Sequence, residues 1–155
     1  MGLESTILDL TGDHPTLLRP GAITTTALER LLEAPILLAG GGGLPRAPGR
    51  HARHYAPRTR AVLVGEERLA DSILSAGSNI GVIARRSRPA SFSGRWVELP
   101  RHPEGYARQL YAVLRELDDQ GLDRILIEAV PVAPAWWALR DRLQRATAVE
   151  DTLRD

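Results

Sequence analysis

The length of 155 residues allows one domain of ordinary size, and 43% hydrophobic with 25% charged residues is typical of a soluble globular chain. The absence of cysteine excludes disulfides, thiol nucleophiles and cysteine-ligated zinc, and a net charge of +1 argues against a broad electrostatic surface for nucleic acid. There is no run of about 18 apolar residues and no signal-peptide pattern, so we expect no membrane contact and a cytoplasmic location.

The first 35 residues predict a strand, a second strand and a helix. Residues 5–10 and 16–19 are rich in β-branched and apolar side chains on either side of a turn, which indicates a hairpin. Residues 24–33 predict the helix, with Thr26 and Glu29 spaced as a capping box. Two strands and one helix leave apolar faces without a partner, so this segment resembles the end of a larger fold. Its open strand edges also favour pairing with another copy of the chain, a homo-oligomer.

Residues 47–57 predict a shaped loop, because they are dense in functional side chains and show neither helical nor strand periodicity. Prolines fix the backbone at both ends of the loop. Between them lie five polar side chains, Arg50, His51, Arg53, His54 and Tyr55. The glycines at 40–43 indicate a flexible linker, since no Lys-Ser/Thr follows them as in a phosphate loop. The spacing of His51 and His54 is compatible with two metal ligands, but the loop holds no carboxylate, so a zinc site is the less favoured interpretation.

The remaining chain alternates short apolar runs with helical patterns. The runs that predict strands are 60–65, 79–84, 95–100 and 124–130, and the predicted helices are 66–76, 103–120 and 134–147. Strands separated by helices require crossover connections, hence parallel pairing. We therefore expect an α/β fold: a small Rossmann-like, mainly parallel sheet with helices on both faces over residues 60–155, preceded by an extended linker and the strand-strand-helix segment.

Two pairs of residues in this layer leave alternatives open. Trp136 and Trp137 are adjacent, so one should be buried and the other should lie at an interface or a partly exposed pocket. Asp123 and Glu128 flank the last predicted strand, where a ligand could bind beside the carboxyl end, although the sequence equally allows a surface position.

Five stretches, taken together, resemble the long form of threonylcarbamoyl-AMP synthase in the same order along the chain. They are Gly2-Leu-Glu-Ser-Thr-Ile-Leu-Asp-Leu-Thr11, Leu18-Arg-Pro-Gly-Ala-Ile-Thr24, Ala47-Pro-Gly49, His54-Tyr-Ala-Pro57 and Asp141-Arg-Leu-Gln-Arg-Ala146. The resemblance covers essentially the whole chain. It implies three parts: residues 1–35 as the tail of a YrdC-like catalytic domain, 36–59 as a linker that folds over the catalytic pocket, and 60–155 as a Rossmann-like C-terminal domain.

The activity implied by the resemblance belongs to tRNA modification in the cytoplasm. Such enzymes join L-threonine, bicarbonate and ATP, as its magnesium complex, into threonylcarbamoyl-adenylate and release pyrophosphate. A partner transferase then places the threonylcarbamoyl group on an adenosine of tRNA.

The resemblance also implies roles for individual side chains. Ser5, Thr6, Arg19 and Arg53 are the implied substrate- or nucleotide-binding residues, and His54 and Tyr55 the implied catalytic ones. A hydroxyl and a planar guanidinium suit carboxylate and phosphate oxygens. Tyr55 can donate to a bicarbonate or carbamate oxygen while the loop excludes water. No metal ligand is implied.

Two departures from the family pattern bear on activity. The loop has Arg50 and Ala52 where relatives commonly carry methionine and an aromatic residue, and the family's upstream nucleotide-binding motifs, including a lysine, are missing. We therefore expect this chain to need the catalytic-domain half of the synthase as a partner and to be inactive alone. The alternatives are a stand-alone non-catalytic module that binds a nucleotide or a protein, and an RNA-contacting accessory domain. The latter would use a basic surface formed by Arg50, Arg53, Arg140, Arg142 and Arg145.

Overall fold

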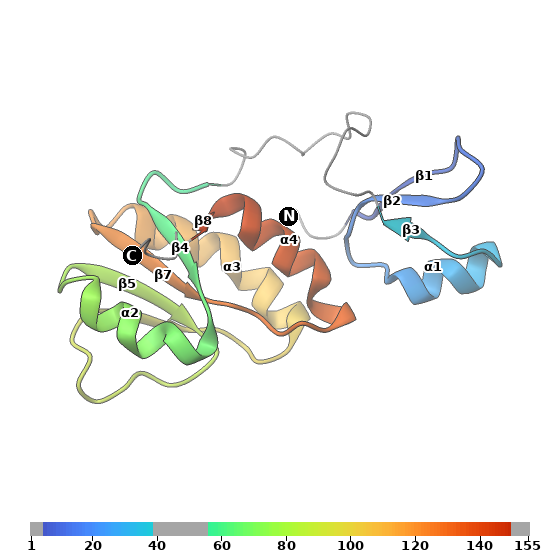
Figure 1. The fold of residues 1–155 in the computed structure, drawn as a ribbon. Coiled ribbons are helices and arrows are strands. Elements are labelled where there is room, and N and C mark those ends of the chain that lie inside the picture. The colour runs from blue at the N-terminus through green and yellow to red at the C-terminus, as the bar shows by residue number, and fades with distance from the viewer. Residues whose placement is uncertain (1–4, 39–55, 150–155) are drawn as a thin grey trace, which may run out of the picture.

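The computed structural model describes residues 5–38 and 56–149, which form two units (Figure 1). The N-terminal unit comprises residues 5–38 and the C-terminal unit residues 56–149. Each unit has its own sheet: three strands in the first and five in the second. Among the described residues, no helix combines the length and the apolar character needed to span a bilayer.

The N-terminal unit contains the predicted hairpin. Strand β1 (Ile7–Asp9) pairs antiparallel with β2 (Thr16–Arg19). A further strand, β3 (Leu37–Leu38), pairs parallel with β2, so residues 36–38 belong to this unit in the structure. The division into tail, linker and C-terminal domain stays a prediction.

Helix α1 (Thr25–Leu32) covers one face of this small sheet. The core of the unit is a cluster of Leu17, Leu28 and Ile36, against which Leu8 and Leu32 pack. Only three side chains are thus buried here, which is a small core for a unit that carries three strands and a helix.

The predicted capping box at Thr26 and Glu29 is wrong. Thr24 has extended backbone angles and is the N-cap, and its hydroxyl accepts the backbone N–H of Ala27 at 3.3 Å. Glu29 instead accepts the backbone N–H of Ile36 at 3.2 Å, beyond the end of the helix. The three consecutive threonines at 24–26 each have a hydroxyl that could cap the helix, and in the structure Thr24 is the one that does.

The C-terminal unit is built on a parallel sheet with the strand order β6-β5-β7-β4-β8. Its strands are β4 (Ala61–Val64), β5 (Ile80–Ala84), β6 (Arg95–Glu98), β7 (Arg124–Glu128) and β8 (Ala148–Val149). All pairings are parallel, which confirms the predicted α/β class. The sequence predicted four of these strands and missed β8, because two residues carry no measurable periodicity.

Helices cover both faces of this sheet, as expected. Helix α2 (Leu69–Ser75), after a 3-10 turn at Glu66–Arg68, packs on one face over a cluster that includes Val62, Val82 and Leu126. The opposite face is covered by two longer helices, α3 (Pro103–Asp118) and α4 (Trp137–Ala146). A 3-10 turn at Pro134–Trp136 leads into α4. Figure 1 shows the N-terminal unit beyond the α4 edge of this second layer.

Helix α3 follows its sequence signals closely. Pro103 occupies the first turn, and Nδ1 of the N-cap His102 accepts the backbone N–H of Gly105 at 3.2 Å. The side chains that recur on one face are fully buried against the sheet: Tyr106, Leu110, Leu114 and Leu117. Gly121, with φ +66°, supplies the left-handed position just after the helix end.

Candidate functional site

Three predicted site residues meet at one end of the β1–β2 hairpin. Nε–H of Arg19 donates to the carbonyl oxygen of Ser5 at 3.2 Å. The hydroxyl of Thr6 donates to the carbonyl of Ile23 at 3.2 Å and accepts the backbone N–H of the same residue at 3.1 Å. Thr6 therefore ties the first strand to the segment that follows Arg19.

Gly21 explains why this junction can close. A Cβ at this position would overlap the backbone of Ser5 and Thr6, so only glycine allows the two segments to approach so closely. The Arg19-Pro20-Gly21 sequence thus places a guanidinium and a close backbone crossing beside two hydroxyl-bearing residues. These are groups that bind carboxylate and phosphate oxygens.

The other predicted residues, Arg53, His54 and Tyr55, lie outside the described residues, as does His51. Their roles stay predictions. Within residues 5–38 and 56–149, no three His, Asp or Glu side chains gather where they could hold a metal ion.

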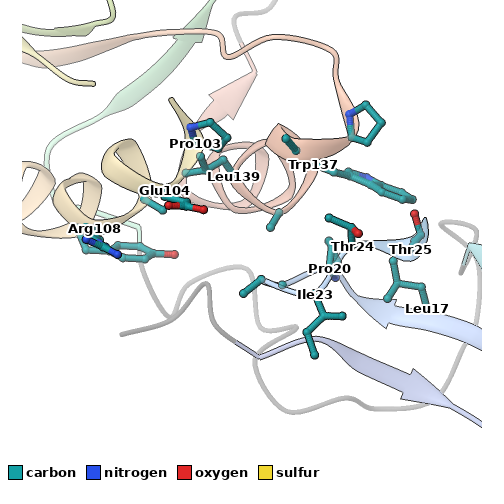
Figure 2. Close-up of a pocket in the computed structure, with 17 residues that line it drawn as sticks. Leu17, Pro20, Ile23, Thr24, Thr25, Pro103, Glu104, Arg108, Trp137 and Leu139 are labelled. Carbon is teal, nitrogen blue, oxygen red and sulfur yellow. The ribbon is translucent and has the colours of Figure 1, made fainter. Parts of the chain in front are cut away.

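A cavity of about 550 Å³ lies between the two units (Figure 2). One wall is the chain from Pro20 to Thr25 with Leu17, and the other is formed by the first turns of α3 and the start of α4. The lining residues from the C-terminal unit are Pro103, Glu104, Ala107, Arg108, Tyr111, Pro134, Ala135, Trp137, Ala138 and Leu139. Sequence reasoning missed this cavity because its walls come from three segments far apart in the chain.

The cavity and the Arg19 junction share one segment of the chain. Ile23 is among the residues that line the cavity, and its backbone N–H and carbonyl oxygen bond the hydroxyl of Thr6. Arg19, Ser5 and Thr6 are not among the lining residues. The same short segment therefore takes part in both the junction and the cavity wall, while the predicted substrate-binding residues themselves do not line the cavity.

The expectation for the adjacent tryptophans is confirmed. Trp136 is 6% exposed and belongs to the core of the C-terminal unit. Its ring packs edge to face against that of Tyr106, with 5.7 Å between the ring centroids. Trp137 is half-buried, lines the cavity and packs against the apolar cluster of the N-terminal unit.

The carboxyl end of the parallel sheet has the topology at which doubly wound folds bind ligands. From β5 the chain continues to β6 on one side, and from β7 it continues to β8 on the other, so the connections diverge between β5 and β7. The side chain that occupies this point is Glu128, which is 2% exposed.

Glu128 is satisfied by the chain itself. Its carboxylate accepts the backbone N–H of Arg85 at 2.6 Å and two hydrogen bonds from the guanidinium of Arg86, at 2.5 and 2.9 Å. The hydrogen bond with Glu128 raises the pKa of Arg86, against the opposing effect of burial. Of the two open alternatives, Glu128 is thus neither a surface residue nor a side chain awaiting a ligand, and Asp123 is exposed.

Two buried groups beside this ion pair lack hydrogen-bond partners within the described part of the chain. They are the hydroxyl of Tyr106 and Nε of Arg85. Burial raises the pKa of Tyr106, since the phenolate would lose its hydration, and the nearby Glu128 adds to the shift. The guanidinium of Arg85 lies 5.8 Å from the ring centre of Trp136.

Two of the three arginines of α4 pair with the same carboxylate. Arg142 is 5% exposed and pairs with Asp141 at 3.1 Å, and Arg145 pairs with the same carboxylate at 2.7 Å. Asp141 thereby offsets one of the three positive charges that Arg140, Arg142 and Arg145 would bring to an RNA-contacting surface.

The chain enters the C-terminal unit through a polar contact with the end of α3. Arg58 pairs with Asp118 at 3.2 Å and with Asp119 at 2.7 Å, and the backbone N–H of Thr59 donates to Asp118 at 2.6 Å. Burial raises the pKa of Asp118, but these hydrogen bonds lower it more, to about 2.

Comparisons with known proteins agree with these features. Residues 23–148 match the family model described as threonylcarbamoyl-AMP synthase, C-terminal domain. The chain is 31% identical over 163 residues to the threonylcarbamoyl-AMP synthase of Pyrococcus abyssi and 30% identical over 158 residues to that of Bacillus subtilis. These alignments cover 95% and 94% of this chain but 46% and 45% of the relatives.

A solved structure shows the same fold. The crystal structure of P. abyssi Sua5 complexed with L-threonine superposes with a TM-score of 0.78 at 32% identity. The superposition covers 93% of this chain and 45% of that one. In sequence and in structure alike, the chain spans a little under half the length of the relatives that it matches.

Proposed function

Since this chain belongs to the threonylcarbamoyl-AMP synthase C-terminal domain family, we propose that it is the C-terminal part of a synthase that forms threonylcarbamoyl-adenylate. The substrates of the whole enzyme would be L-threonine, bicarbonate and the magnesium complex of ATP, and pyrophosphate would leave. The product would pass in the cytoplasm to a transferase that modifies tRNA. The observation that carries the proposal is the family match over residues 23–148.

The proposed division of labour follows from the length of the relatives. The chain spans 46% of the P. abyssi synthase, so the other part of such an enzyme must supply the groups that grip the nucleotide. Positioning and charge stabilisation carry most of the catalysis of a phosphoryl or nucleotidyl transfer. The isolated chain is therefore proposed to be inactive until the catalytic half is added.

Within the proposed site, Arg19 has the clearest role. Its hydrogen bond to Ser5 fixes the guanidinium at the hairpin end, where its planar fork suits the threonine carboxylate or a phosphate. Ser5 is exposed and would add a hydroxyl to the same anion. Thr6 has its hydroxyl engaged with Ile23, so it would hold the junction rather than donate that hydroxyl to substrate.

The linker residues complete the proposed site. Tyr55 would donate to a bicarbonate or carbamate oxygen, His54 would act beside it, and Arg53 would add a second guanidinium. Excluding water matters for this chemistry, because a carbamate in water decomposes before it is adenylated.

The test is threonine-dependent release of pyrophosphate with ATP, magnesium and bicarbonate. Three samples are compared: the 155-residue chain, the catalytic half of the P. abyssi relative, and both together. We expect release that depends on L-threonine only when both are present. Equal release by the catalytic half with and without this chain would overturn the proposal, as would full activity of this chain alone.

A further inference from the structure

The N-terminal unit, as far as the structure describes it, has a small apolar core. Its core contains three buried side chains, Leu17, Leu28 and Ile36, and its helix has only eight residues. A core of this size contributes little stability, so contacts between residues 5–38 and other parts of the molecule should weigh heavily in holding the unit in place.

In the structure, the side chain of Trp137 makes such a contact with the N-terminal unit. This side chain comes from the first position of α4 in the C-terminal unit, yet it packs on the apolar cluster of the N-terminal unit. Figure 2 shows its indole over Leu17 and Thr25, next to the segment that begins at Pro20. A tryptophan provides a large apolar area with few rotatable bonds, which is why tryptophan dominates contacts of limited extent.

The surroundings of Trp137 concentrate the contact on this one ring. The cavity of about 550 Å³ occupies the boundary next to it, so the walls formed by α3 and by residues 20–25 do not pack together there. On its own side, Trp137 lies between Trp136 and Leu139 in the sequence, and burial of these two residues in the C-terminal core fixes the start of α4. The indole is thus presented from a rigid base.

We propose that Trp137 is the anchor through which the C-terminal unit docks on the N-terminal unit and holds α1 and β2 in position. Trp137 packs against the cluster that contains Leu17, and Leu17 lies two residues before Arg19 in β2. Docking of the indole therefore also fixes the end of the strand that carries Arg19. This inference does not rest on the proposed enzymatic activity, because both units belong to the same chain and their docking can be measured directly.

Amide hydrogen exchange of the full 155-residue chain tests the proposal. Trp137→Ala should speed exchange of the amides in α1 and β2 at least tenfold, while the amides of β5 and β7 change less than threefold. Trp137→Phe should restore most of the protection, since a phenyl ring retains much of the apolar contact. Trp96→Ala is the matched control: Trp96 packs edge to face on Phe92 on the α2 face of the sheet. That control should leave α1 and β2 unchanged.

A second readout follows Arg19 itself. The Nε–H resonance of Arg19, which donates to Ser5, should lose protection in Trp137→Ala and regain it in Trp137→Phe. Unchanged exchange of α1 and β2 in Trp137→Ala would overturn the proposal. So would equal acceleration in both units, because Trp137 would then be an ordinary core residue of the C-terminal unit. If Trp137→Ala does not fold, Trp137→Leu is measured by the same criteria.

Discussion

Glu128 and Arg86 form an ion pair of 2.5 Å at the point where the connections of the parallel sheet diverge. In a doubly wound fold this position is where a ligand usually binds. Here the carboxylate is buried and its oxygens are taken up by Arg85 and Arg86. The pair therefore has a structural role, and its removal should be measurable as a loss of stability.

Glu128→Ala should lower the free energy of unfolding by about 2–4 kcal/mol, because Arg86 would lose its buried partner and the backbone N–H of Arg85 its acceptor. Urea unfolding followed by circular dichroism measures the change. Glu66→Ala is the control, since Glu66 pairs with the same guanidinium but is 65% exposed, and it should cost no more than about 0.5 kcal/mol. Equal losses in the two variants would contradict the structural role of Glu128.

Tyr106→Phe should leave the free energy of unfolding unchanged or raise it by up to about 1 kcal/mol. The ring is fully buried, and its hydroxyl has no hydrogen-bond partner within the described residues, so the substitution removes a buried polar group without removing a bond. Thermal unfolding of the variant beside the unaltered chain gives the answer. A loss of more than about 1 kcal/mol would mean that the hydroxyl has a partner after all.

Asp118→Asn should remove part of the dependence of stability on pH. Because the pKa of Asp118 is lowered from 3.8 to about 2 on folding, its contribution is present above about pH 4 and is lost as pH falls toward 2. After allowance for solvent screening, we expect Asp118 to contribute about 1 kcal/mol to the free energy of unfolding at neutral pH. Unfolding measured at several values of pH between 2 and 7 should show a flatter profile for the variant. Asp119→Asn, at a carboxylate that is 63% exposed, should keep the original profile.

Arg19→Gln should lower threonine-dependent pyrophosphate release at least tenfold in the synthase assembled from both halves. A charge-assisted hydrogen bond to an anion is worth about 1.5–3 kcal/mol, and glutamine keeps much of the bulk without the charge. Arg30→Gln, on α1, is a control of the same type and should retain activity. If the two variants are equally active, Arg19 does not contact substrate.

Tyr55→Phe in the same assembly should leave ATP binding intact and lower turnover. The hydroxyl is proposed to act on the bicarbonate or carbamate oxygen and not on the nucleotide. Binding of ATP by calorimetry and turnover by pyrophosphate release separate the two effects. Unchanged turnover would exclude Tyr55 from the site.

Most of the C-terminal sheet could be predicted because its strands and helices repeat strong local patterns. Helix α3 is the clearest case: Pro103, the period of its apolar residues and Gly121 all indicate the same boundaries. Strands β3 and β8 could not be predicted, since each has two residues and exists only through its partner strand. The cap of α1 could not be predicted either, because three consecutive threonines offer the same hydroxyl and the structure uses Thr24.

The candidate site was predictable only where chemistry and backbone constraint coincide. The sequence Arg19-Pro20-Gly21 indicates both a guanidinium and a close approach of two backbone segments. In the structure, Arg19 bonds Ser5, and Gly21 lies against the backbone of Ser5 and Thr6. The cavity and the docking of Trp137 depend on how two units meet, which no local pattern contains. Likewise, the sequence left Glu128 open between ligand and surface, because the two arginines that bind it belong to another strand end.

Glu128, bonded by Arg85 and Arg86, occupies the carboxyl end of the sheet where a ligand would otherwise bind, and this has a practical consequence for chemical probes. Nucleotide-like fragments directed at the sheet would have to displace a carboxylate already bound by two arginines, so a screen there should give few hits. The cavity between the units is not filled in this way, and its walls come from both units. Compounds that bind in this cavity would either weaken or strengthen the docking of the two units. Their effect on docking could be measured without contact to Arg19, which does not line the cavity.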